Sequence, residues 1–132
     1  MDQRVQVLIV DHEVHTRQGL QALLAAWPEI KVMGAANGIE TVQLVEKCRP
    51  DVALMDIPVP VPALSGAEVM DGLGVIRLIK SRWPQVRIVV LTMYATHRAA
   101  ALAAGADAFL LKGCLAQDLL EAIVSQASIG QG

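Results

Sequence analysis

The stretch VQVLIVD, at residues 5–11, is a short apolar run that ends in an aspartate. Runs of this length that are rich in β-branched residues are typical of strands buried on both faces of a parallel sheet. The stretch PDVALMD, at residues 50–56, repeats the arrangement and again ends in an aspartate. The pattern predicts strands at residues 5–10, 30–35, 52–55, 86–91 and 108–111.

Apolar residues at helical spacing lie between these runs. After the first strand, Leu20, Leu23, Leu24 and Trp27 recur every three or four positions, and Pro28 ends the helix. Similar patterns predict helices at residues 13–27, 39–45, 95–104 and 115–128, and one that ends at residue 83. Five strand–helix units in succession predict an α/β fold, a doubly wound five-stranded parallel sheet with helices on both faces.

Length and composition indicate one folded domain. The chain has 132 residues, of which 54% are hydrophobic and 18% charged, so we expect a domain over residues 1–128 and a tail at residues 129–132. No apolar run approaches the roughly 20 residues of a membrane span, and the start does not resemble a signal peptide. Cys48 and Cys114 lack the paired spacing of a disulfide scaffold or zinc site. A soluble, cytoplasmic domain without a membrane partner is expected.

The charge pattern argues against direct binding to nucleic acid. The net charge is −2, from 11 basic and 13 acidic residues, and the basic residues are scattered along the chain. A domain that binds nucleic acid normally carries a basic stripe. We therefore expect this chain to contact DNA only through another domain.

Polar residues stand at the ends of four predicted strands. Asp11 follows the first strand, Asp56 the third, Thr92 the fourth and Lys112 the fifth. The carboxyl ends of parallel strands lie at one edge of the sheet, where open α/β sheets bind their ligands. The sequence therefore predicts a shared site of two carboxylates, a hydroxyl and an ammonium group.

This set of groups suits phosphoryl transfer to a carboxylate. Two neighbouring carboxylates favour a hard divalent cation such as Mg²⁺, which takes oxygen ligands and neutralises an incoming phosphoryl group. Asp56 is the candidate nucleophile, and it would carry an aspartyl phosphate. Lys112 and the hydroxyl of Thr92 would each donate to a phosphoryl oxygen.

These motifs resemble the receiver domains of two-component response regulators. The matching segments are VLIVD at 7–11, RQGL at 17–20, PDVALMD at 50–56, VLTMY at 90–94 and AGADAFLLK at 104–112. The segments LTMY and LLKG are most similar to the sequences of the subgroup that is joined to LuxR/NarL-type DNA-binding domains. The resemblance implies a flavodoxin-like sheet of order 2-1-3-4-5.

The resemblance also implies roles for individual residues. Asp56 would accept a phosphoryl group from a sensor histidine kinase in a Mg²⁺-dependent reaction, with Asp11 and the backbone carbonyl of Pro58 also at the metal. Thr92 and Lys112 would contact the phosphate, and Phe109 would be the aromatic switch that changes the surface of the fourth helix and fifth strand. That surface would serve an output, with transcription as the expected one, or a homodimer. Catalysis would be limited to slow self-phosphorylation and dephosphorylation.

The chain departs from the family pattern at the second metal-binding acid. Receiver domains usually have two adjacent acids after the first strand, whereas this chain has Asp11 and then His12. Neutral imidazole suits Mg²⁺ less well than zinc, copper or nickel. Glu13 is a second candidate for the missing ligand, although an acid at a helix start also complements the helix dipole.

The loop after Asp56 is a second departure. Both Ser65-Gly66 and Asp71-Gly72 fit the family's turn. Taking Asp71-Gly72 leaves an insertion of about eight residues between Val61 and Glu68, inside the stretch 58–70 that Pro58, Pro60 and Pro62 stiffen. A loop beside an active crevice can control access, or it can be a surface insertion, and both interpretations stay open.

Two functional hypotheses follow. The first is a receiver controlled by phosphorylation, which Asp56, Thr92 and Lys112 favour. The second is a degenerate receiver that acts as a protein-interaction module without phosphorylation, which His12 favours. We prefer the first, and we expect residues 129–132 to be a tail or the start of a linker to an output domain that lies outside this chain.

Overall fold

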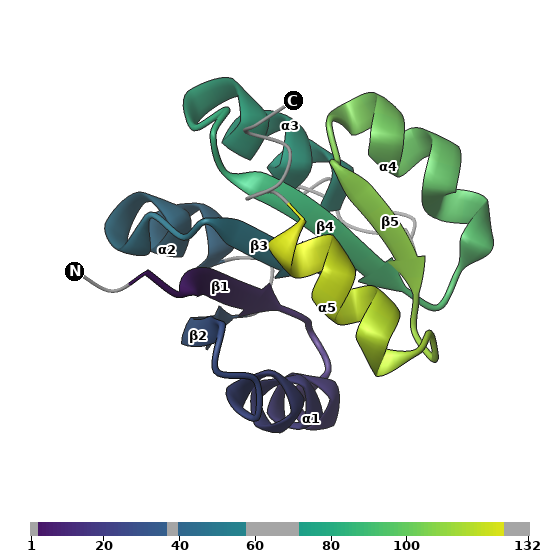
Figure 1. The fold of residues 1–132 in the computed structure, drawn as a ribbon. Helices are drawn as coiled ribbons and strands as arrows, with labels where there is room; N and C mark the ends of the chain where they lie inside the picture. The colour runs from purple at the N-terminus through teal and green to yellow at the C-terminus, as the bar shows by residue number, and fades with distance from the viewer. Residues whose placement is uncertain (1–2, 37–39, 58–71, 126–132) are drawn as a thin grey trace.

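The computed structural model describes residues 3–36, 40–57 and 72–125, and its arrangement is shown in Figure 1. Five parallel strands form one sheet in the order β2-β1-β3-β4-β5, which confirms the predicted fold. The strands are β1 Val5–Val10, β2 Ile30–Ala36, β3 Val52–Met55, β4 Arg87–Thr92 and β5 Ala108–Leu111. The proline-containing insertion, Pro58 included, and the tail at 129–132 lie outside the described residues.

Helices cover both faces of the sheet. They are α1 Val14–Ala25, α2 Thr41–Cys48, α3 Gly72–Arg82, α4 Arg98–Ala104 and α5 Ala116–Val124, with a 3-10 turn, η2, at Ala95–His97. One buried cluster joins α2, α3 and α4 to one face, and a second joins α1 and α5 to the other. In Figure 1 the yellow α5 crosses in front of the strands, with the purple α1 beside it.

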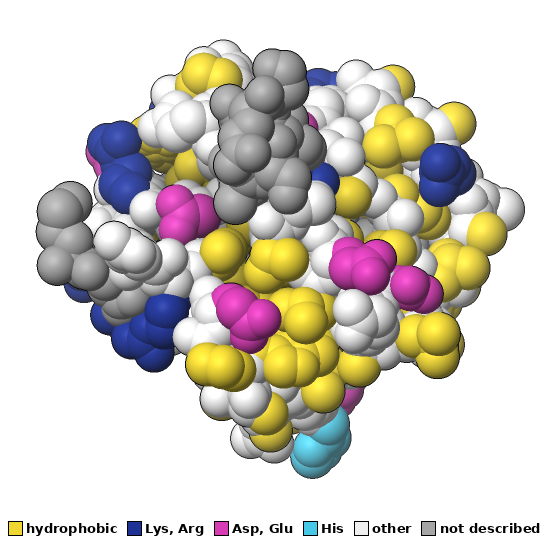
Figure 2. All heavy atoms as spheres, viewed as in Figure 1, with side chains coloured by type: hydrophobic (Ala, Val, Ile, Leu, Met, Phe, Trp, Pro, Cys, Tyr) yellow, Lys and Arg dark blue, Asp and Glu magenta, His cyan; other side chains and the backbone are white. Residues whose placement is uncertain are grey.

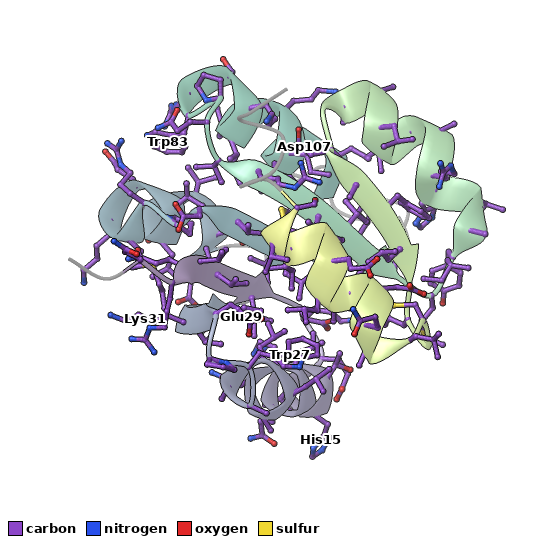
Figure 3. The ribbon with its side chains drawn as sticks, in the orientation of Figure 1. His15, Trp27, Glu29, Lys31, Trp83 and Asp107 are labelled. Carbon is purple, nitrogen blue, oxygen red and sulfur yellow. The ribbon has the colours of Figure 1, made fainter. Side chains whose placement is uncertain are left out.

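Alternation along the strands creates these two cores. In β1, Leu8 and Val10 face the first cluster, whereas Val7 and Ile9 face the second, and all four are 2% exposed or less. Successive side chains of a strand point to opposite faces, so a strand buried on both faces needs apolar residues at every position. Trp83, labelled in Figure 3, closes the edge of the first cluster under the guanidinium of Arg49.

The register of the strands aligns their carboxyl ends. Val10 pairs with Met55, and Met55 pairs with Val90. The residues that follow Val10 and Met55, Asp11 and Asp56, therefore emerge side by side. The amide of Asp56 donates to the carbonyl of Val10 at 2.8 Å, which fixes the relative height of the two carboxylates.

The helix boundaries differ in detail from the predicted ones. The helix expected at 95–104 is divided into η2 and α4, because the chain first turns with 3-10 geometry, where the amide of His97 donates to the carbonyl of Tyr94 at 3.1 Å. Thr92 is the last residue of β4 rather than the residue after it. Among the described residues, no helix is long and apolar enough to span a membrane.

Candidate functional site

The four polar residues predicted to converge do so at the carboxyl edge of the sheet. Asp11 is 2% exposed, Asp56 9% and Thr92 fully buried, and Lys112 is half-buried above them. Burial of charged groups is costly unless they are paired. The sheet edge therefore holds two carboxylates that need cationic partners.

Lys112 is one of these partners. Its Nζ lies 2.9 Å from Oδ2 of Asp11 and 3.4 Å from Oδ2 of Asp56. Burial lowers the pKa of Lys112, but the hydrogen bond to Asp11 and the charges of Asp56 and Asp11 outweigh burial and raise the pKa above its ordinary value. Lys112 is thus a fixed ammonium group that joins the ends of β1, β3 and β5.

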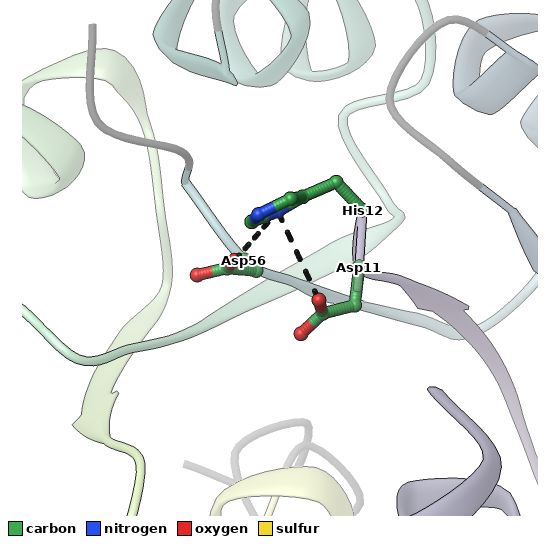
Figure 4. A group of neighbouring side chains, drawn as sticks. All are labelled: Asp11, His12 and Asp56. Carbon is green, nitrogen blue, oxygen red and sulfur yellow. Dashed lines mark ion pairs between the residues drawn. The ribbon is translucent and has the colours of Figure 1, made fainter. Parts of the chain in front are cut away.

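His12 is a second polar partner of the two carboxylates. Its Nδ1 lies 3.2 Å from Oδ2 of Asp56 and 3.9 Å from Oδ1 of Asp11, as Figure 4 shows. Its side chain is 59% exposed, so the ring lies over the mouth of the site rather than within it. The residue that replaces the expected acid thus contacts the candidate nucleophile directly.

Glu13 turns away from this cluster. It is the N-cap of α1, and its carboxylate accepts hydrogen bonds from the amides of His15 and Thr16 and from the Thr16 hydroxyl, the last at 2.8 Å. These bonds, that from the Thr16 hydroxyl first, lower the pKa of Glu13. The structure therefore gives Glu13 a capping role. It leaves His12 as the third candidate metal ligand beside the two aspartates.

Arg17 holds the backbone at the site, which the residue types at the strand ends did not indicate. Its guanidinium donates to the carbonyl of Asp11 at 2.6 Å from one turn into α1. Asp11 in turn accepts from the amide of Glu13 at 2.9 Å through Oδ1. The one available signal was the place of Arg17 at the start of the motif RQGL. These contacts fix the loop that carries Asp11 and His12.

Thr92 and Phe109 lie on the α4 side of the site. The Thr92 hydroxyl accepts from the amide of Tyr94 at a long 3.4 Å. Phe109 is half-buried against the first core cluster, and the guanidinium of Arg98 lies 6.0 Å from its ring centre. Since the Thr92 bond is long, the hydroxyl is free to exchange it for a stronger one.

Asp11, His12 and Asp56 form a group that could hold a metal ion. One ligand atom from each residue lies within 4.8 Å of the others. The two carboxylates fit Mg²⁺, which prefers oxygen, whereas the imidazole nitrogen does not. Pro58, whose carbonyl was the other predicted ligand, lies outside the described residues. The donor set is therefore a mixed one of oxygen and nitrogen.

A family model, "Response regulator receiver domain", matches residues 7–124. The chain belongs to the response regulator receiver family. The matched span begins within β1 and contains all the later elements and every site residue described above. The receiver domain therefore accounts for the fold and for the convergence of Asp11, Asp56, Thr92 and Lys112.

Individual relatives of this receiver domain are of the LuxR/NarL type. It is 34% identical over 128 residues to the transcriptional regulatory protein DegU of Brevibacillus brevis, covering 92% of the chain and 50% of the relative. It is 36% identical over 121 residues to the DNA-binding transcriptional activator DevR/DosR of Mycobacterium tuberculosis, covering 88% and 51%. The chain thus spans about half the length of these curated relatives.

A solved structure shows the same fold. The signal receiver domain of the putative response regulator NarL from Mycobacterium tuberculosis superposes with a TM-score of 0.81 at 27% identity, covering 96% of this chain and 98% of that one. The receiver fold and its strand order are thus shared across nearly the whole chain.

Proposed function

We propose that this receiver domain accepts a phosphoryl group on Asp56 from a sensor histidine kinase and thereby controls an output. The observation that carries the proposal is the position of Lys112, whose ammonium group joins Asp11 and Asp56 at 2.9 and 3.4 Å. An ammonium group between two buried carboxylates is a ready counter-charge for a phosphoryl group that arrives there.

The geometry favours one oxygen of Asp56 as the nucleophile. Within the described residues, both ion pairs of Asp56, with His12 and Lys112, involve Oδ2. Oδ1 is then the oxygen that attacks phosphorus, so a P–O bond forms as the P–N bond of the kinase phosphohistidine breaks and the imidazole leaves with the electron pair. Lys112 would then contact the phosphoryl oxygens, and the Thr92 hydroxyl would donate to one of them.

The proposed phosphoryl transfer uses a divalent cation, and the resemblance to receiver domains implies that this cation is Mg²⁺. Asp11 and Asp56 would hold it, with water and the carbonyl of Pro58 as further oxygen ligands. When bound, the cation supplies positive charge that offsets the charge of the phosphoryl group. Both aspartates are buried, and one carboxylate oxygen of Asp11 lies within 4.8 Å of one from Asp56.

The output surface that we propose is formed by α4 and β5. Exposed apolar side chains gather there, with Leu102 on α4, Leu111 on β5 and Met93 and Tyr94 in the preceding loop, each 39% exposed or more. Isolated exposed apolar residues are common, but a group around one switch element favours protein contacts. Phosphorylation would shift a pre-existing equilibrium of this surface through Thr92 and Phe109.

A second apolar surface lies between α1 and α5. A groove of about 410 Å³ there is lined by residues that include Leu20, Leu23, Cys114 and Leu119. Figure 2 shows apolar side chains on this face between acidic ones. Contacts with a partner protein there would bury these apolar residues.

The proposal extends to the whole protein by analogy with its relatives. Residues 1–128 would be the receiver domain, and residues 129–132 would begin a linker to an output domain that contacts DNA. The protein would act in the cytoplasm as a regulator and not as an enzyme, apart from slow self-phosphorylation and autodephosphorylation.

Intact mass after incubation with a small-molecule phosphodonor and Mg²⁺ tests the proposal. We expect one added phosphoryl group on the wild type, none on Asp56→Asn, and none without a divalent cation. Asp51→Asn is a matched control, because Asp51 lies at the opposite end of β3 and accepts from the amide of Gln6. Failure of the wild type to gain mass with either Mg²⁺ or Mn²⁺ would favour the degenerate receiver.

A further inference from the structure

The group of Asp11, His12 and Asp56 offers one nitrogen and two carboxylate positions, which is not the all-oxygen set that Mg²⁺ prefers. We propose that this site binds a first-row transition metal, such as Co²⁺, more tightly than Mg²⁺, because His12 supplies an imidazole ligand. The inference rests on the proposed function for the role of the site, but metal binding can be measured without phosphorylation.

The distances between donor atoms suit a shared metal. Ligand atoms about 2.0–2.2 Å from one metal, at the angles of octahedral or tetrahedral coordination, lie roughly 3.0–3.5 Å from each other. His12 Nδ1 lies 3.2 Å from Oδ2 of Asp56, within that range, and 3.9 Å from Oδ1 of Asp11. The exposed imidazole ring needs to move toward Asp11 for its Nδ1 to come within that range of both carboxylates.

The ammonium group of Lys112 leaves one oxygen of Asp11 available to this metal. Lys112 contacts Oδ2 of Asp11, whereas His12 approaches Oδ1 of the same carboxylate. The ammonium group and the imidazole thus contact different oxygens of Asp11, although both lie near Oδ2 of Asp56. A divalent ion on the His12 side, together with Lys112, offsets the two buried carboxylates.

No other described acid can restore an oxygen site in place of His12. Glu13 is the adjacent acid, and its carboxylate is engaged by three donors from His15 and Thr16 at the start of α1. Moving Glu13 to the metal would break the N-cap of α1. Imidazole is thus the third side-chain ligand that the fold presents, and imidazole favours metals along the series from Mn²⁺ to Cu²⁺ over Mg²⁺.

Titration calorimetry with Co²⁺ alone and with Mg²⁺ alone tests the proposal on the wild type, His12→Asp and His15→Ala. His15→Ala is the matched control, because His15 projects into solvent from α1 in Figure 3 and is not part of the metal-binding group. We expect one Co²⁺ site in the wild type, and a ratio of Co²⁺ to Mg²⁺ affinity at least about tenfold larger than in His12→Asp. His15→Ala should match the wild type.

Two results would overturn the inference. One is an equal affinity ratio in the wild type and His12→Asp, and the other is loss of the Co²⁺ site in His15→Ala. A circular dichroism spectrum of His12→Asp that matches the wild type separates loss of a ligand from loss of the fold.

The same samples can test this inference and the proposed function independently. The intact mass of each variant is measured after incubation with phosphodonor and Co²⁺, and again with phosphodonor and Mg²⁺. Tight Co²⁺ binding without any phosphoryl addition would support the metal inference and contradict the proposed function. Phosphoryl addition with Mg²⁺, together with equal ratios of Co²⁺ to Mg²⁺ affinity in the wild type and His12→Asp, would support the proposed function and contradict the metal inference.

Discussion

The imidazole Nδ1 of His12 lies 3.2 Å from Oδ2 of Asp56, the carboxylate that follows β3. This contact joins two residues that are far apart in the chain, and it arises because β1 and β3 are paired in register up to Val10 and Met55. His12, the residue after Asp11, therefore lies next to the carboxyl end of β3. A substitution there acts on the proposed phosphoacceptor, Asp56, and not on a remote part of the surface.

Replacing Lys112 by methionine should destabilise the protein by about 1–3 kcal/mol, because two buried carboxylates would lose their shared ammonium partner. Urea unfolding without divalent metal measures the loss. Lys112→Arg, which keeps the charge, should lose less. Adding Asp11→Asn to Lys112→Met should recover part of the stability, since one of the two like charges is removed. A Lys112→Met variant as stable as the wild type would contradict the ion pairs described here.

The N-cap of α1 should give a pH-dependent contribution to stability. Because hydrogen bonds lower the pKa of Glu13 from its ordinary 4.5, its carboxylate stabilises the folded state above that pH. The contribution should disappear as the pH falls through the lower, folded-state pKa. We expect Glu13→Gln to have a lower Tm than the wild type at pH 7, with a difference that narrows as the pH falls below 4.5. A difference that stays constant on acidification would argue against the capping role.

Two glycines should respond oppositely to alanine. Gly105 ends α4 with a φ of +118°, and a Cβ there would meet Cγ of Lys80 at 3.0 Å. Gly105→Ala should therefore destabilise the protein by about 1–2 kcal/mol. Gly19 lies inside α1, and a Cβ added there would meet no heavy atom within 4 Å, so Gly19→Ala should stabilise by about 0.5–1 kcal/mol. Urea unfolding of both variants decides the point, and the same sign for both would contradict it.

The convergence of the site was predictable from sequence because parallel strands share one carboxyl edge. Asp11, Asp56, Thr92 and Lys112 could be placed there from the ends of four apolar runs, and the structure brings them together. The contact between His12 and Asp56 could not be predicted, since it depends on which way one exposed side chain turns. The same holds for Arg17, whose bond to the carbonyl of Asp11 needs the angle between α1 and β1.

The boundaries of helices depend on local bonds that periodicity does not reveal. Residues 95–104 are rich in alanine and predicted one helix, but the turn of Ala95–His97 precedes α4. Ala99, Ala100 and Ala101 have similar helix propensity wherever the helix starts, and the N-cap of α4, His97, makes no side-chain capping bond. Glu13 was expected in the first turn of a helix and is instead its N-cap, one position earlier.

Thr92 should matter for phosphorylation more than for stability. Its hydroxyl accepts one long hydrogen bond, at 3.4 Å from the amide of Tyr94, so Thr92→Val should cost less than about 1 kcal/mol of unfolding free energy. If the hydroxyl donates to the phosphoryl group as proposed, Thr92→Val should lower the rate of mass gain with phosphodonor by about tenfold or more. Thr92→Ser, which keeps the hydroxyl, is the control. Equal rates for serine and valine would remove Thr92 from the mechanism.

Phe109 should report the state of the site from the neighbouring strand. Val90 pairs with Phe109 and Thr92 pairs with Leu111, so Thr92 and Phe109 are two positions apart along the same face of the β4–β5 pair. Phe109 packs against the core under the guanidinium of Arg98, at the surface proposed for output. An inward movement of Thr92 on phosphorylation would change the space beside the ring, so the ring should change its environment when Asp56 is phosphorylated.

Trp emission from Phe109→Trp, after subtraction of the wild-type signal from Trp27 and Trp83, measures that change. We expect a shift in emission maximum when phosphodonor and Mg²⁺ are added, and no shift when Asp56→Asn or Thr92→Val is combined with Phe109→Trp. The Asp56→Asn combination tests whether phosphorylation causes the shift, and the Thr92→Val combination tests whether the hydroxyl transmits it. If intact mass shows complete phosphorylation and the emission is unchanged, Phe109 does not sense the phosphoryl group. The conformational change that controls the output would then have to pass through elements other than β5.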